Sequence, residues 1–251
     1  MELKKSLGQH FLHDISVLER IQSAVESLQP IETMIEVGPG MGALTEYLVE
    51  MPCQRYLLIE KDDRFVEELP KKYPKIEKNI VHQDVLTFDF SILGNKNISV
   101  IGNFPYNISN LIVFWMIENV DYVQNSVGMF QKEVAMRIAS SHGKKDYGIL
   151  SVLTQSLYEV EYLFDIAPES FDPPPKVVSG VIRMRRREQP KANYTQLKRL
   201  VKSAFNQRRK MLSNSLKSLQ IMDMNVYEKY KSLRPEQLSV EDFCELSKHI
   251  V

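Results

Sequence analysis

Residues 103–106, Asn-Phe-Pro-Tyr, combine two hydrogen-bond acceptors with an aromatic ring. The Asn103 side chain carries an amide oxygen that can accept a hydrogen bond from an amino group. Pro105 favours an extended conformation at Phe104, which turns the Phe104 carbonyl outward as a second acceptor. Tyr106 offers a flat face on which a base can stack, worth roughly 1–3 kcal/mol. These residues predict a site for an exocyclic amine on a planar ring, such as N6 of adenine; the alternative is a proline-centred turn with a buried aromatic.

Four short apolar runs must position this loop and its neighbours. Residues 34–37, 56–59, 80–83 and 98–101 are predicted to be strands, and each is followed by a glycine or a polar residue. In open α/β sheets, ligands bind beyond the carboxyl ends of the strands. The expected strands therefore bring Gly38 with Gly40, Glu60, Asp84 and Asn103 to one rim.

The first of these strands leads into a glycine-rich turn at residues 38–42, preceded by Glu36. Its spacing is G-x-G-x-G rather than the G-x-G-x-x-G of dinucleotide-binding loops, but glycines before a helix still let a ligand approach the backbone. Glu60 follows about twenty residues later, where an acid can accept from both ribose hydroxyls; alternatively it is a solvated charge. A carboxylate at Asp84 can accept from the amino group of an adenine.

The composition is that of an ordinary globular chain, with 251 residues of which 43% are hydrophobic and 25% are charged. There is no apolar run of about 18 residues and no signal-peptide pattern at the N-terminus, so no membrane association is expected. The two cysteines form no redox or metal motif and predict reduced thiols in the cytoplasm. His10 and His13 are close enough to suggest a metal pair, but an ordinary loop is the preferred interpretation, and no metal is expected.

The rest of the chain completes an α/β fold. Asp14 is expected to cap a helix, residues 125–131 to form a fifth strand, and residues 160–166 and 177–184 to form an antiparallel pair. From residue 193 onward the pattern is helical. We therefore predict a Rossmann-like sheet with helices on both faces over residues 1–187 and a small all-α domain over residues 188–251.

The net charge of zero conceals a basic segment. Between Arg183 and Lys217 the chain has twelve Lys or Arg residues and one acid, Glu188. Such a segment is either a solvated face or a phosphate-binding surface, and in a neutral chain this asymmetry favours phosphate contacts. The residues predicted to bind RNA are Arg183, Arg185, Arg186, Arg208, Arg209 and Lys210.

Together these motifs resemble those of a known family. Residues 36–42, Glu60, Asp84 and residues 103–106 are similar to the successive motifs of S-adenosylmethionine-dependent adenine-N6 methyltransferases. Residues 8–12 (Gly-Gln-His-Phe-Leu), 171–179 and 205–216 narrow the resemblance to the ribosomal RNA adenine dimethylases. Two departures are visible, because Phe104 stands where this family usually has Leu and His10 where Asn is common.

The resemblance implies an enzyme that dimethylates N6 of two adjacent adenosines near the 3′ end of small-subunit (16S) rRNA. It implies S-adenosylmethionine as methyl donor and, as partner, rRNA within a partly assembled 30S subunit late in assembly; we expect a monomer. It assigns catalysis to Asn103, Phe104, Pro105 and Tyr106, with Phe171 as a second stacking ring or, alternatively, a core residue. The residues that it assigns to the donor are His10, Leu12, Gly38, Gly40, Glu60, Asp84 and Asn103.

Two other functions stay open. One is methylation of a different polynucleotide, large-subunit rRNA or DNA, which the basic segment at residues 205–210 and the helical C-terminus disfavour. The other is a non-catalytic ribosome assembly or transcription factor on the same fold, which an intact Asn-x-Pro-Tyr loop disfavours. Residues 7–12 show no regular period and are expected to be an irregular, mobile segment.

Overall fold

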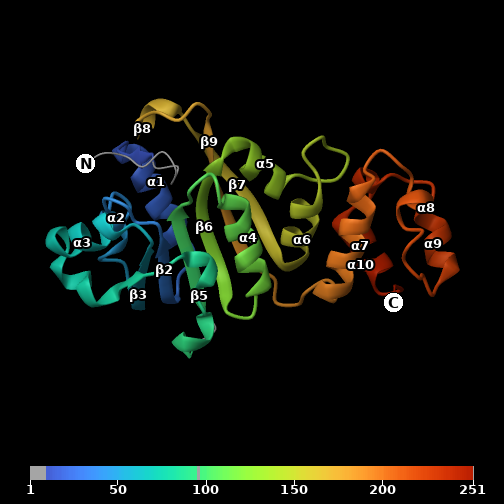
Figure 1. Cartoon of the computed structure of the whole chain (residues 1–251), viewed down its shortest axis with the longest axis horizontal. Helices are drawn as coiled ribbons and strands as arrows, with labels where there is room; N and C mark the ends of the chain where they lie inside the picture. Colours follow the sequence, from blue (N-terminus) through green and yellow to red (C-terminus); the bar gives the residue numbers. More distant parts are fainter. Residues whose placement is uncertain (1–9, 95–96, 251) are drawn as a thin grey trace. The chain divides into compact units, whose positions relative to one another are not determined.

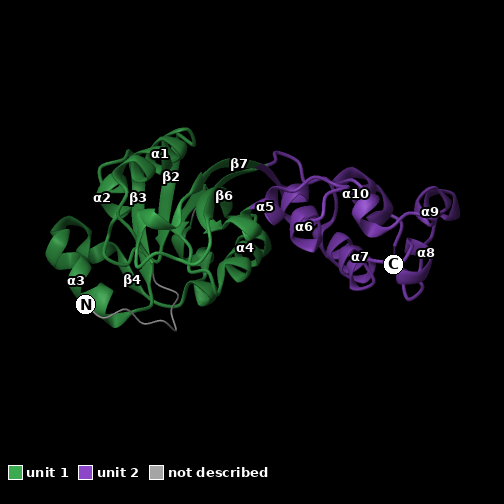
Figure 2. Cartoon of the chain, turned by 90° about the horizontal axis from the view of Figure 1, so that it is seen from above, with its two compact units in different colours: residues 1–135, 161–186 green, residues 136–160, 187–251 purple. Residues whose placement is uncertain are grey.

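The computed structural model describes residues 10–94 and 97–250 of the chain. The chain divides into two compact units (Figure 2). Unit 1 comprises residues 1–135 and 161–186, and unit 2 comprises residues 136–160 and 187–251. The last passage into unit 2 falls between residues 186 and 187, whereas the sequence analysis placed the domain boundary between residues 187 and 188. Unit 2 also includes residues 136–160, which the sequence analysis placed in the catalytic domain.

A seven-stranded sheet forms the framework of the first unit, as Figure 1 shows, and the α/β fold class is confirmed. Its strand order is β4-β3-β2-β5-β6-β9-β7. The first five of these strands are parallel, and β9 runs antiparallel to β6. As expected, the last two strands are neighbours, with β9 inserted between β6 and β7. The strands are β2 (Ile31–Val37), β3 (Cys53–Glu60), β4 (Ile80–His82), β5 (Ile98–Asn103), β6 (Val123–Gln131), β7 (Tyr158–Ile166) and β9 (Ser179–Arg186).

The register of the parallel strands places their carboxyl ends side by side. Glu36 pairs with Leu58 on one side and with Ile101 on the other. Parallel strands buried on both faces are near-continuously apolar, and β5 follows this rule, with Ile98, Val100 and Ile101 fully buried. The four expected site-bearing strands therefore do end at one rim.

Helices cover both faces of this sheet. Figure 2 shows α1 on one side of the strands and α4 on the other. Asp14 caps the first helix as predicted, accepting hydrogen bonds from the backbone N–H groups of Ser16 and Val17. The helices that begin in this unit are α1 (Ile15–Glu26), α2 (Thr45–Leu48), α3 (Asp63–Lys72), α4 (Ser109–Glu118) and α5 (Lys132–Ala139).

The N-terminal segment is more regular than its sequence suggests. Residues Phe11–Leu12 form strand β1, which pairs antiparallel with β8 (Phe171–Asp172), Phe11 opposite Asp172 and Leu12 opposite Phe171. The expectation of an irregular segment is therefore wrong for residues 11–12, because a partner from 160 residues further along the chain supplies the hydrogen bonds. Residues 7–9 of that expectation lie outside the described residues.

Unit 2 is helical around an aromatic and aliphatic core. Its centre includes Leu200, Phe243 and the ring of Tyr147, all fully buried. The segment that follows residue 193 is helical, as predicted. Within residues 10–94 and 97–250, no helix has the length and apolar character needed to cross a membrane. The helices are α6 (Ile149–Leu157), α7 (Tyr194–Asn206), α8 (Leu212–Ser215), α9 (Met224–Tyr230) and α10 (Val240–Ser247).

Candidate active site

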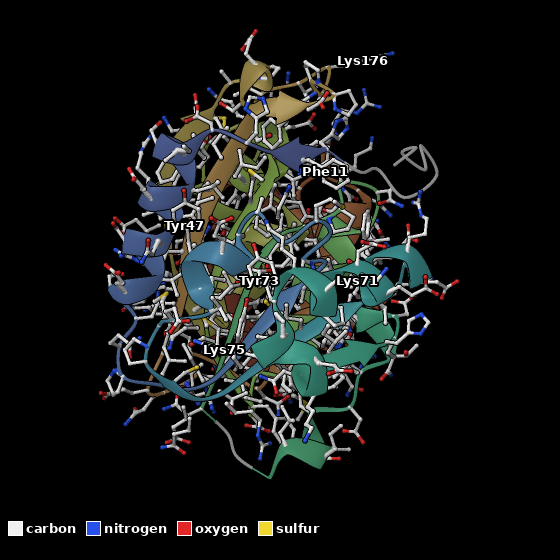
Figure 3. The ribbon with its side chains drawn as sticks, turned by 90° about the vertical axis from the view of Figure 1, so that its left-hand side faces the viewer. Phe11, Tyr47, Lys71, Tyr73, Lys75 and Lys176 are labelled. Carbon is white, nitrogen blue, oxygen red and sulfur yellow. The ribbon has the colours of Figure 1, made fainter. Side chains whose placement is uncertain are left out.

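The glycine turn after β2 has a backbone that side chains would strain. Gly38, Gly40 and Gly42 have φ of 66°, 56° and 80°. Aromatic rings approach two of them: a Cβ on Gly40 would lie 3.4 Å from Phe11 Cε1, and one on Gly42 would lie 2.6 Å from Tyr73 Cε2. Phe11 and Tyr73, from β1 and the residue after α3, lie on the same face of unit 1 (Figure 3). Aromatic side chains therefore pack closely against this turn, residues 38–42, which we call the glycine cradle.

Glu60, at the end of β3, is tied to this turn. Its Oε2 accepts a hydrogen bond from the Gly40 N–H at 3.1 Å, while Oε1 accepts from the N–H groups of Lys61 and Asp62 at 2.7 and 2.8 Å. Burial raises the pKa of Glu60, and these hydrogen bonds oppose that shift. The alternative of a solvated charge is excluded, since Glu60 is only 7% exposed.

Asp84 follows β4 and is held by a neighbour of Glu60. Lys61 Nζ lies 2.7 Å from Asp84 Oδ2, and the Leu86 N–H donates to Oδ1 at 3.0 Å. The hydrogen bond from Lys61 is the main reason that the pKa of Asp84 is lowered. Asp84 is therefore an ionised acceptor at neutral pH, fixed at the same rim as Glu60.

Beneath the glycine turn lies a buried carboxyl group, that of Glu36. Its Oε2 accepts hydrogen bonds from Thr45 Oγ1 at 2.8 Å and from the Tyr56 hydroxyl. Glu36 is 1% exposed, and burial raises its pKa to about 7. This network joins β2, β3 and the start of α2 below the cradle.

The Asn103 amide has a defined orientation. Its nitrogen donates to the main-chain carbonyl of His10 at 3.1 Å, which identifies that atom as Nδ2 because a carbonyl only accepts. The other amide atom, Oδ1, is thereby left as the acceptor that the sequence analysis required. Phe104 is fully buried and its N–H bonds to the Met129 carbonyl, which anchors the loop to β6.

Tyr106 is fixed at two places. Its hydroxyl shares a short hydrogen bond with Ser179 Oγ at the start of β9. The His10 ring stacks on it, with centroids 5.6 Å apart and planes inclined by 29°. Burial of the hydroxyl raises the pKa of Tyr106. The orientation of the Tyr106 ring is therefore fixed by these two contacts.

These groups surround one pocket of about 190 Å³. The pocket collects every residue that the sequence analysis assigned to the methyl donor, and it also collects the predicted catalytic loop. The lining residues that match those predictions are His10, Leu12, Gly38, Gly40, Glu60, Asp84, Asn103, Phe104, Pro105 and Tyr106.

Phe171 lies elsewhere. It does not line the pocket, and its side chain is 1% exposed within the core that also contains Leu12 and Ile166. In this structure the core alternative for Phe171 holds, because the β1–β8 pairing places the ring inside. The second ring beside Tyr106 is that of His10.

The six residues predicted to bind RNA separate into two groups. Arg183, Arg185 and Arg186 lie on β9, in the sheet of unit 1, and not in the helical domain. Arg183 pairs with Glu161 and donates to Ser27 Oγ, and Arg185 donates to the Ser27 carbonyl. Arg186 lies 3.4 Å from Asp121.

The remaining three, Arg208, Arg209 and Lys210, follow α7 in unit 2 and are exposed. Arg208 donates to the Lys145 carbonyl at 2.6 Å. The single basic stretch of the sequence is therefore divided between the units, with Arg183, Arg185 and Arg186 in unit 1 and the exposed Arg208, Arg209 and Lys210 in unit 2.

Several residues of the site were missed by sequence reasoning. Lys61 directly follows Glu60, and Ser179 closes the proline motif, so both had a positional signal in the sequence. Tyr56 and Thr45 had none, because a hydroxyl below a turn leaves no pattern in one sequence.

In the described part of the chain, no group of three His, Cys, Asp or Glu could hold a metal ion.

Comparison with known proteins places the chain among rRNA-modifying enzymes. A family model described as ribosomal RNA adenine dimethylase matches residues 1–250. Ribosomal RNA small subunit methyltransferase A of Flavobacterium johnsoniae is 46% identical over 257 residues, covering 100% of this chain and 96% of that protein.

Two solved structures share the fold over nearly the whole chain. A dimethyladenosine transferase from Plasmodium falciparum has a TM-score of 0.82 at 22% identity, covering 96% of this chain and 99% of its own. The 23S rRNA methyltransferase ErmE has a TM-score of 0.75 at 25% identity, covering 95% and 98%.

Proposed function

Because this chain belongs to the ribosomal RNA adenine dimethylase family, we propose that it transfers methyl groups from S-adenosylmethionine to N6 of adenosines in small-subunit rRNA. The modified bases would be two adjacent adenosines near the 3′ end of that RNA, within a partly assembled subunit. The similarity to a small-subunit enzyme at 46% identity, against 25% for the 23S enzyme, supports the small subunit over the large one.

One observation carries the proposal: the Asn103 amide, whose nitrogen donates to His10 and whose other atom is therefore an acceptor, shares a pocket with the glycine cradle and two fixed carboxylates. Adenine N6 is a poor nucleophile because its lone pair is delocalised into the ring. Asn103 Oδ1 and the Phe104 carbonyl would accept from its two hydrogens and favour a pyramidal nitrogen. The rate would come from positioning and fixed dipoles, without a strong base.

The cradle side of the pocket suits the methyl donor. Gly38 and Gly40 line the pocket with backbone alone, Glu60 Oε2 is an acceptor at the position for a ribose, and the ionised Asp84 is an acceptor for an amino group. When bound, S-adenosylmethionine supplies a methyl group activated by a sulfonium. The residues that would hold it are Leu12, Gly38, Gly40, Glu60, Asp84 and Asn103, together with the main chain of His10.

The target base must leave its stack to reach such a pocket. Tyr106, which lines the pocket, would stack on the extruded adenine. Because the catalytic loop would act on a single extruded base, selection among RNA sites would rest on shape recognised elsewhere, and the exposed cations Arg208, Arg209 and Lys210 are our candidates.

The direct test is methyl transfer from labelled S-adenosylmethionine to small-subunit particles from cells lacking this protein, followed by mapping of the modified nucleotides. We expect two adjacent dimethyladenosines from the wild type. Asn103→Ala should lower kcat by roughly 10²–10³-fold, as removal of one acceptor that acts on the developing charge does. RNA binding should persist, because Asn103 acts on the amine and not on phosphate.

Asn110→Ala is the matched control, since Asn110 is exposed in the first turn of α4. It should methylate like the wild type. If only large-subunit rRNA or DNA became labelled, small-subunit rRNA would not be the substrate. Near-wild-type turnover of the Asn103→Ala variant would remove the two-acceptor mechanism.

A further inference from the structure

We propose that the side chain of His10 serves the substrate base and not the methyl donor: it is a positioning residue that holds Tyr106 and leaves it one face for adenine. The inference rests on the proposed function and assigns a role to a ring that sequence motifs place with the donor. Three contacts of His10 carry it, two with the catalytic loop at residues 103–106 and one with the proline turn after β8.

The first contact is the stack on Tyr106. The two rings lie 5.6 Å apart with an inclination of 29°, which is an offset stack of the kind that aromatic pairs prefer. One face of Tyr106 is thus covered from within the chain. We assign the opposite face to the base that enters the pocket, which Tyr106 lines.

The second contact fixes the His10 ring. Its Nδ1 lies 2.8 Å from the carbonyl oxygen of Pro173. Since a carbonyl only accepts, Nδ1 carries the hydrogen, and the ring is tied to the proline turn that follows β8. The ring therefore has a preset direction before any base arrives.

The third contact reaches the group that acts on the amine. The main-chain carbonyl of His10 accepts from Asn103 Nδ2. One residue thus orients both the amide at one end of the catalytic loop and the ring at the other. Preset orientation of both groups lowers the cost of ordering them in the transition state.

The far end of Tyr106 is held independently. Its hydroxyl bonds to Ser179, which is completely buried. With Ser179 at the hydroxyl and His10 on one face, the ring has no need of a second aromatic from Phe171, which is buried in the core. By covering one face of the Tyr106 ring, His10 leaves only the other face for a base.

The test separates the ring of His10 from its hydrogen bond. His10→Phe keeps a ring but has no donor for Pro173, His10→Asn keeps an N–H donor but has no ring, and His10→Ala has neither. All three keep the main-chain carbonyl that accepts from Asn103. His13→Asn is the matched control, since His13 is exposed and three residues away.

Three measurements are made on each folded variant: kcat and KM on small-subunit particles, S-adenosylmethionine affinity by calorimetry, and quenching of 2-aminopurine riboside fluorescence by the donor-bound protein. We expect unchanged donor affinity throughout. We expect kcat to fall by roughly 2- to 12-fold in His10→Ala, the range that an aromatic pair supports. His10→Phe should restore the quenching and most of kcat, whereas His10→Asn should restore neither.

Equal or higher kcat in His10→Ala would overturn the inference, because the ring would then occupy the face that adenine needs. Failure of His10→Phe to exceed His10→Ala would overturn it too. Loss of donor affinity in all three variants would show that the His10 side chain binds the donor, which contradicts the inference. An inactive wild type would instead remove the proposed function, so the two failures are distinguishable.

Discussion

The ring of Phe104 lies directly over Gly128 of the neighbouring strand: a Cβ on Gly128 would be 2.2 Å from Phe104 Cε2. Gly102, opposite Gly128 in the β5–β6 register, is crowded in the same way, with 2.9 Å to Phe104 Cε1. A Phe at this position of the catalytic loop thus needs two glycines beneath it. The Phe104 side chain, one of the two departures from the family pattern, is thus a buried anchor of the loop.

We expect Gly128→Ala to destabilise the protein by roughly 1–3 kcal/mol, the usual cost of overpacking, and to lower methyl transfer by displacing Asn103. Urea denaturation and single-turnover kinetics measure the two effects. Adding Phe104→Leu should recover part of both losses, since the smaller side chain makes room. Gly148→Ala is the control, because a Cβ there meets nothing within 4 Å. Wild-type stability of Gly128→Ala would contradict the packing argument.

The buried Glu36 should make stability depend on pH. Its pKa rises from an ordinary 4.5 to about 7 in the folded chain, so the folded state holds a proton that the unfolded state has released between these values. Stability from this group is therefore complete below pH 4.5 and is lost as pH rises through 7.

Glu36→Gln removes this titration. The free energy of unfolding of the variant minus that of the wild type should rise between pH 5 and pH 8, by at most about 3 kcal/mol. Glu50→Gln, at an exposed carboxylate paired with Lys75, should show no comparable rise. A constant difference between wild type and Glu36→Gln across this range would show that Glu36 is ionised throughout.

Glu60 should contribute to donor affinity through its charge. We expect Glu60→Gln to weaken S-adenosylmethionine binding by about 1.5–3 kcal/mol, the value of hydrogen bonds to a charged group. Calorimetry measures it, and Glu68→Gln, on the exposed side of α3, serves as the control. Unchanged affinity for S-adenosylmethionine in both Glu60→Gln and Asp84→Asn would show that the donor does not bind at this rim.

The two groups of basic residues should behave differently toward RNA. Replacing Arg208, Arg209 and Lys210 by Glu should flatten the dependence of binding on salt, by roughly 0.7–0.9 in log–log slope for each phosphate that these side chains neutralise. Arg183→Met should leave the slope unchanged and reduce stability, because its guanidinium is paired with Glu161 inside unit 1. Filter binding at several salt concentrations tests this. Equal slopes for the triple variant and the wild type would mean that phosphates bind to other cations.

The parts of the fold that local pattern determines were predictable. Apolar runs gave the parallel strands and Asp14 gave the start of α1, because both depend on neighbouring residues alone. The rim of the site followed from topology, since carboxyl ends of parallel strands meet wherever the strands do. This is why Glu60, Asp84 and Asn103 could be placed together without coordinates.

The parts that depend on distant partners were not predictable. Strand β1 exists because Asp172 and Phe171 lie beside it, and Phe171 is buried for the same reason. Arg183 carries a charge that suggests RNA, but Ser27 and Glu161 surround it in space. Side-chain pairing across the fold has no period along the chain, so composition alone overstated the size of the basic surface.

The pairing of Phe11 with Asp172 has a consequence for synthesis of the chain. The glycine turn and strands β2 to β6 come from residues that leave the ribosome early. The segment that completes the pocket, His10 to Leu12, is made before them but pairs with a strand near residue 172, which is made after them. Long-range pairing of this kind forms late and slowly. A nascent chain that ends before β8 therefore holds the carboxylates of the rim without the strand that completes the pocket, and the pocket is completed only after residue 172 has been translated.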